Sequence, residues 1–111
     1  MSIESDLNAL LDSFSAASAG LFEITGRYGQ SFEGGIYRCA IARPSKRMRA
    51  TLSADREVLV AASTFADQQQ RTVKFVKREI EASEGRFEPT VAIVIHKDVE
   101  ASHRVELSQT E

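Results

Sequence analysis

The sequence predicts an α+β fold in which helices pack on one mixed β-sheet. Two short, continuous apolar runs, residues 58–62 and 91–95, enclose a long segment of helical periodicity, and this is the order of a βαβ unit. An apolar stripe of helical period opens the chain, and residues 37–53 alternate between apolar and polar. We therefore expect an N-terminal helix, an antiparallel hairpin or three-stranded meander, and then the βαβ unit. The 111 residues suffice for a single domain, 1–111.

The first predicted element is a helix over residues 1–20. Ser2 is a suitable N-cap, acidic residues lie in the first turn where the helix dipole favours them, and Gly20 suits the position after the last turn. Apolar residues recur at steps of three and four: Ile3, Leu7, Leu10, Leu11 and Phe14. The same stripe reaches Tyr28, which would give one longer helix. The glycine favours the shorter helix, with a strand that starts in residues 21–25.

The alternating stretch predicts two antiparallel strands. Apolar residues alternate with basic or small ones over residues 37–42 and again over residues 47–53. Residues 43–46 between them have the pattern of a tight turn, with proline at its second position. In this hairpin Arg47 and Arg49 lie on the exposed face of the second strand.

The βαβ unit is predicted as a strand at Val58–Ala62, a helix at about residues 65–84 and a strand at Val91–Ile95. Residues 64–67 have the spacing of a capping box, and Gly85 ends the helix. The crossover should be right-handed, which makes the two strands parallel neighbours. The helix residues expected to face the core are Ala66, Val73, Val76 and Ile80.

This order of elements resembles the core of the PD-(D/E)xK nuclease superfamily, which runs helix, three strands, helix, strand. The resemblance implies a Mg²⁺-dependent site with an acid on the second core strand and Glu-x-Lys on the third. In this sequence residues 58–62 contain neither an acid nor a lysine, and Glu57 is followed by Leu59 where the lysine would stand. The resemblance therefore implies a catalytically inactive nuclease-like module.

Composition narrows the class of protein. Apolar residues make up 42% and charged residues 27% of the chain, as in ordinary globular domains. No apolar run approaches the roughly 20 residues that span a bilayer, and the N-terminus is acidic where a secretory signal is basic. A lone Cys39 and two histidines give no disulfide and no metal-ligand spacing. We predict a cytoplasmic protein with no membrane association, cofactor or metal. The polar residues 101–111 should form an edge strand at most, followed by a frayed tail.

Charge is segregated along the chain. Residues 1–35 carry a net charge of −4, residues 36–78 of +7 and residues 79–111 of −5, within a total of −2. Such a basic middle can meet a polyanion, an acidic partner or the chain's own acidic ends. The predicted binding residues are the cations of the hairpin and of the following helix: Arg38, Arg43, Lys46, Arg47, Arg49, Arg71 and Lys74. Aromatic residues that could stack on nucleic-acid bases are scarce, with Tyr37 and Phe75 the only candidates, which weighs against a nucleic-acid interface.

A second candidate site lies where the two apolar runs end. Ser63 and Thr64 follow the first run, and His96 and Lys97 follow the second. Ligands of open sheets gather beyond the carboxyl ends of parallel strands, so these side chains could form a small anion pocket with the N-terminus of the helix. The alternative is a helix cap and a solvated turn. Ser63, His96 and Asp98 have the residue types of a catalytic triad, but Asp98 lies too close to His96 in sequence to orient it well.

These patterns favour a small non-enzymatic protein that binds a macromolecule. Our first interpretation is a protein–protein interaction domain, of an adaptor, inhibitor or regulatory kind, steered by segregated charge. A homodimer would use the same charges, with the acidic ends of one copy against the basic middle of the other. The alternative is a nucleic-acid-binding or inactive nuclease-like module that uses the basic hairpin. A small-anion-binding domain or an enzyme at the strand ends ranks third.

Overall fold

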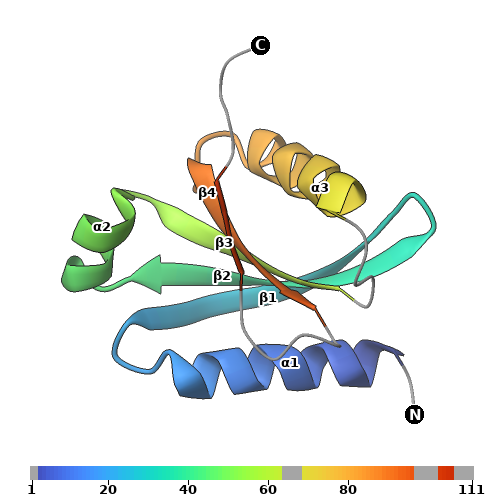
Figure 1. The fold of residues 1–111 in the computed structure, drawn as a ribbon, viewed down its shortest axis with the longest axis horizontal. Helices are drawn as coiled ribbons and strands as arrows, with labels where there is room; N and C mark the ends of the chain where they lie inside the picture. Colours follow the sequence, from blue (N-terminus) through green and yellow to red (C-terminus); the bar gives the residue numbers. More distant parts are fainter. Residues whose placement is uncertain (1–2, 64–68, 97–102, 107–111) are drawn as a thin grey trace.

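The computed structural model describes residues 3–63, 69–96 and 103–106, which form a five-stranded mixed sheet with helices on both faces (Figure 1). The elements are α1 (Ile3–Ala17), β1 (Phe22–Phe32), β2 (Gly35–Pro44), α2 (Lys46–Leu52), β3 (Glu57–Ser63), α3 (Gln69–Ala82), β4 (Phe87–His96) and β5 (His103–Glu106). The strands are ordered β1-β2-β3-β4-β5, and only the β3–β4 pair is parallel. Helix α1 covers one face of the sheet and α3 the other. The predicted α+β fold, with its meander and βαβ unit, is confirmed.

Helix α1 ends near the predicted position. Its buried face is formed by Leu7 and Leu11, which are 0% and 1% exposed. Beyond the last turn, the backbone N–H and the hydroxyl of Ser18 both donate to the Phe14 carbonyl. Gly20 then adopts φ of +85°, a left-handed conformation that costs glycine little. Since β1 begins immediately afterwards, the alternative of one longer helix is wrong.

The hairpin predicted for residues 37–53 is wrong in its second strand. Strand β2 pairs instead with β1, across a turn formed by Glu33 and Gly34. Both turn residues have positive φ, 49° and 81°, as in the two-residue turns that match the twist of paired strands. Strand β2 also pairs with β3, so the three strands form the meander.

Helix α2 occupies the segment predicted as that second strand. Ser45 caps it, because its side-chain oxygen accepts a hydrogen bond from the Met48 N–H at 3.2 Å. Met48 and Leu52 are four residues apart, a spacing that fits one face of a helix as well as one face of a strand. The residues between them are mostly good helix formers, so the capped segment becomes helical. Arg47 and Arg49 are exposed, as predicted, but on a helix.

The βαβ unit is present where the sequence places it. Strands β3 and β4 are parallel neighbours, joined by α3. Val76 is 0% exposed, and Val73 and Ile80 pack against the same core. Gly85 follows the helix with φ of +95°. The predicted capping box, residues 64–67, and Ala66 lie outside the described residues.

The buried side chains form two cores, one on each face of the sheet. The core under α1 includes Leu7, Leu11, Val58, Val60 and Ile93. The core under α3 includes Tyr37, Leu59, Phe75, Val76 and Val94. The C-terminal segment contributes β5 at the far edge, as predicted, and the rest of that segment is outside the described ranges. No helix within the described ranges has the length and apolarity needed to cross a bilayer.

A buried polar contact joins α3 to β1. Glu79 is 7% exposed and accepts hydrogen bonds from the Tyr28 hydroxyl at 3.0 Å and from the Arg78 guanidinium at 3.1 Å. Burial raises the pKa of Tyr28, so its hydroxyl stays protonated and able to donate. The Arg78 guanidinium also lies 4.6 Å from the ring centroid of Phe32. These contacts fix the edge strand β1 against α3.

Candidate functional site

Cationic side chains gather at one end of the molecule, at the end of β2 and in the chain that links β2 to β3. We call this group the basic cap: Arg43, Lys46, Arg47, Arg49 and Arg56. All five are exposed, and α2 protrudes from the end of the sheet (Figure 1). Residues 43–56 contain one acid, Asp55, and therefore carry a net charge of +4.

Helix α2 directs three of these cations outward. Successive residues of an α-helix are about 100° apart around its axis, so Met48 and Leu52 share one face. Both pack against the core under α1, and Leu52 is 7% exposed. Lys46, Arg47 and Arg49 spread over the opposite face. The apolar face and the Ser45 cap hold the short helix in place, which leaves the cationic face to solvent.

Most cations of the basic cap have no ionic partner among the described residues. Arg43 lies 3.8 Å from Glu23 of β1, and both side chains are exposed. No carboxylate of the described ranges is within salt-bridge distance of the other four. Nearby, Arg86 donates to Glu57 at 2.7 Å, and this hydrogen bond lowers the pKa of the Glu57 carboxyl. Clustered like charges repel one another, so an anionic partner would stabilise the basic cap.

An open depression of about 360 Å³ lies beside the basic cap. Its walls come from the chain between α1 and β1 and from the end of β2 with the start of α2. Arg43 and Arg49 contribute its cations, and Glu23 its acid. An acidic side chain that entered this depression would meet two guanidinium groups.

The remaining predicted binding residues do not join the basic cap. Lys74 is exposed on α3, and Arg71 is half-buried near the start of the same helix. Helix α3 follows β3, whereas α2, which carries most of the basic cap, precedes β3 (Figure 1). Arg38 lies in the middle of β2 and contacts Asn8 of α1. The structure therefore divides the basic middle of the chain among three places. Arg56 was missed from the sequence, although it belongs to the same basic segment.

The two aromatic candidates for stacking on bases belong to the core. Tyr37 and Phe75 are both 0% exposed, and their rings stack on each other with centroids 4.0 Å apart. Both candidates are ruled out as stacking platforms, because both residues face the layer between the sheet and α3. Neither ring is accessible to a base.

The strand ends that define the predicted anion pocket are adjacent. Ser63 of β3 lies opposite His96 of β4, and Tyr37 of β2 lies opposite Ser63. These three side chains form a polar row across the sheet. Ser63 and Tyr37 are 0% exposed and His96 is 7% exposed, so the row lies in the interior. Thr64 and Lys97 lie outside the described residues, and the anion pocket stays a prediction.

Two further chemical roles, a cysteine nucleophile and a nuclease-like metal site, find little support among the described residues. Burial raises the pKa of the Cys39 thiol to about 12, so at neutral pH it is a protonated core residue rather than a nucleophile. Glu57, the acid nearest to the nuclease pattern, accepts hydrogen bonds from Arg86 and Thr25. Among residues 3–63, 69–96 and 103–106, no three His, Cys, Asp or Glu side chains are grouped so that they could hold a metal ion.

No family model, curated protein or solved structure matches the chain. The resemblance to the PD-(D/E)xK core is one of element order: α1, the three strands β1–β3, α3 and β4 follow that order, with α2 inserted between β2 and β3.

Proposed function

We propose that this chain is a small non-enzymatic interaction domain that binds an acidic surface of another protein through the basic cap. The observation that carries the proposal is the set of exposed cations for which the described residues provide no carboxylate: Lys46, Arg47, Arg49 and Arg56. Exposed charge of one sign steers an oppositely charged partner, over roughly 8–10 Å at physiological ionic strength. Adaptor, inhibitor and regulatory domains all use such surfaces.

A protein surface suits the basic cap better than a nucleic acid does. Helix α2 has seven residues and is about 10 Å long, so it can reach few phosphates. Glu23 and Asp55 lie among the cations, where they would repel a polyanion but could pair with basic residues of a protein. The burial of Tyr37 and Phe75 also removes the aromatic platform expected of a single-strand binder.

Two further parts of the proposal concern location and self-association. We propose a cytoplasmic location, which the single, buried cysteine supports. A second copy of the chain is among the acidic partners to be considered, since residues 1–35 carry a net charge of −4.

The test is a pull-down with the full chain as bait, read by mass spectrometry, in three versions of the protein. The cap variant replaces Lys46, Arg47 and Arg49 by Glu. The control variant replaces Lys74 and Lys77 of α3, which are also exposed, by Glu. Because all five side chains are exposed, both variants should melt close to the wild-type temperature. We expect one partner to be captured by the wild type and the control and lost from the cap variant.

A second measurement separates protein from nucleic acid. Fluorescence anisotropy with unrelated duplex DNA and single-stranded RNA, from about 50 to 200 mM salt, should show no cap-dependent binding. Binding that falls steeply with salt and disappears in the cap variant would favour the nucleic-acid module and refute the protein-binding proposal. Sedimentation of the wild type and the cap variant shows whether the acidic partner is a second copy.

A further inference from the structure

Arg38 reaches the open edge of the sheet across Gly29. Strand β1 is the first strand of the sheet, and its outer side is unpaired within the described ranges. Gly29 of β1 lies opposite Arg38 of β2. A Cβ atom built on Gly29 would come within 2.7 Å of the Arg38 Nη1 atom. The guanidinium group therefore occupies the space that a side chain at position 29 would take.

The guanidinium group is held there from the side of α1. Its Nε atom donates to the side-chain oxygen of Asn8 at 3.2 Å. Arg38 is half-buried, and no carboxylate of the described residues lies within salt-bridge distance of it. Arg27, two residues before Gly29, is by contrast paired with Asp12 of α1 at 2.8 Å. Of these two neighbouring cations, Arg38 is the one available to an external anion.

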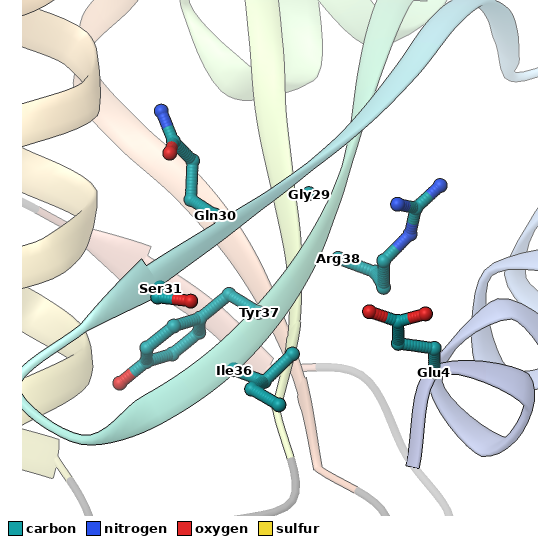
Figure 2. A pocket seen from close by; sticks show the side chains of 7 residues that line it. All are labelled: Glu4, Gly29, Gln30, Ser31, Ile36, Tyr37 and Arg38. Carbon is teal, nitrogen blue, oxygen red and sulfur yellow. The ribbon is translucent and has the colours of Figure 1, made fainter. Parts of the chain in front are cut away.

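An open depression of about 460 Å³ surrounds this group (Figure 2). Ser31 of β1, Ile36 of β2 and Glu4 of α1 contribute to its walls. Figure 2 shows the Arg38 and Glu4 side chains on the same side of the hairpin. Glu4 is exposed and beyond salt-bridge distance of Arg38, so it competes only weakly with an external carboxylate.

The edge itself can receive an extended chain. Strand β1 has 11 residues, and because ladder bonds alternate in antiparallel pairs, every second residue directs its N–H and C=O away from β2. Such an edge accepts an additional strand. A residue of that strand opposite Gly29 would have its Cβ about 5 Å from the place of the missing glycine Cβ. The Arg38 guanidinium lies in that place, so an acidic side chain on the added strand would meet it directly.

We propose that the outer edge of β1 binds an extended segment of a partner protein, and that an acidic side chain of this segment, opposite Gly29, pairs with Arg38. Gly29 is essential to the site, because a side chain at this position displaces the guanidinium group. The site goes beyond the function proposed for the basic cap and does not depend on it. Gly29 lies toward the β1–β2 turn, whereas α2 follows the other end of β2 (Figure 1).

The probe is a short threonine-rich peptide with one central glutamate, and its matched peptide carries glutamine at that position. Binding is followed by backbone amide shifts and by fluorescence anisotropy. We expect shifts to cluster at residues 27–31 and the glutamate peptide to bind about tenfold more tightly. Arg38→Gln should abolish this preference. Gly29→Ala should abolish it too while keeping the charge, and it should fold, because Gly29 has no positive φ and only the flexible end of Arg38 must move.

Two variants serve as controls. Arg27→Gln should keep the tenfold preference, since Arg27 is already paired with Asp12. Glu4→Gln should strengthen binding of the glutamate peptide, since it removes the Glu4 carboxylate from the wall of the depression.

Three results would overturn the proposal. Equal affinities of the two peptides, or a preference that survives Gly29→Ala, would refute the pairing with Arg38. Shifts outside β1, or no shifts at saturating peptide, would refute the edge as the binding site. Protection of the β1 amides that rises with protein concentration alone, together with a dimer in sedimentation, would assign the edge to a second copy of the chain.

Discussion

The hydrogen bond between Tyr28 and Glu79 should be measurable as a coupling energy. It joins β1 to α3 at 3.0 Å, and its acceptor is 7% exposed. Tyr28→Phe removes only the donor hydroxyl, and Glu79 keeps its hydrogen bonds from Arg78. Hydrogen bonds to charged groups contribute about 1.5–3 kcal/mol. Because Arg78 still satisfies the carboxylate, we expect the lower end, about 1.5 kcal/mol of unfolding free energy. With an unfolding entropy of about 2.1 cal/mol/K per residue, this corresponds to a fall in Tm of roughly 6 °C for 111 residues.

The assay is a double-mutant cycle with Tyr28→Phe, Glu79→Ala and the double variant, because alanine leaves no acceptor for the Tyr28 hydroxyl. The chain has no tryptophan, so urea unfolding is followed by far-UV circular dichroism. We expect a coupling energy of about 1 kcal/mol or more between the two positions. If the two effects add to within roughly 0.3–0.5 kcal/mol, the hydrogen bond does not hold β1 and the reasoning is refuted.

Three further predictions concern the core and the ion pairs. Val76→Ala should lower the free energy of unfolding by about 1–3 kcal/mol in urea melts, because it deletes fully buried methyl groups, whereas exposed Lys77→Ala should change it by less than about 0.5 kcal/mol. Cys39 should resist alkylation at neutral pH until the protein unfolds, and rapid labelling of the native state would contradict its burial. Arg86→Gln should raise the pKa of Glu57 toward its ordinary value of 4.5, measured by NMR titration of the carboxyl group. Since the folded pKa of Glu57 is lowered, this pair stabilises the fold above pH 4.5, and the stabilisation is lost as the pH falls through the folded pKa. The unfolding free energies of the wild type and of Arg86→Gln should therefore become equal at low pH.

The sequence predicts the βαβ unit well because its pattern admits one interpretation. The run from Val58 to Ala62 is apolar at every position, since Val58 and Val60 face the core under α1 while Leu59 and Ala61 face the core under α3. The segment of α2 was predicted wrongly because a spacing of four residues fits the period of a helix and the period of a strand. There the deciding interaction is the Ser45 cap, a single hydrogen bond that hydrophobic periodicity does not register.

The candidate sites depend on register, which local patterns specify less well. The proximity of Ser63 and His96 could be predicted from the sequence, because a crossover helix makes its two strands parallel neighbours. The pairing of Gly29 with Arg38 depends on how β1 aligns with β2. That alignment is set by the two-residue turn at Glu33 and Gly34, which the periodicity of apolar residues does not locate. The contact between the Arg38 guanidinium group and Gly29 was therefore visible only in three dimensions.

Part of the charge that is segregated along the chain is paired in space. Asp12 and Arg27 pair within the acidic first block, and Glu57 of the basic middle pairs with Arg86 of the acidic last block. The cations of α2 remain outside this pairing, because the apolar face of the helix packs on the core and its cations therefore face solvent. A strand would have presented Arg47 and Arg49 side by side, as a flat stripe, whereas a helix spreads Lys46 and both arginines around its axis. For the protein partner that we propose, acidic groups on more than one side of the helix, as in a cleft, would therefore fit better than a flat acidic face.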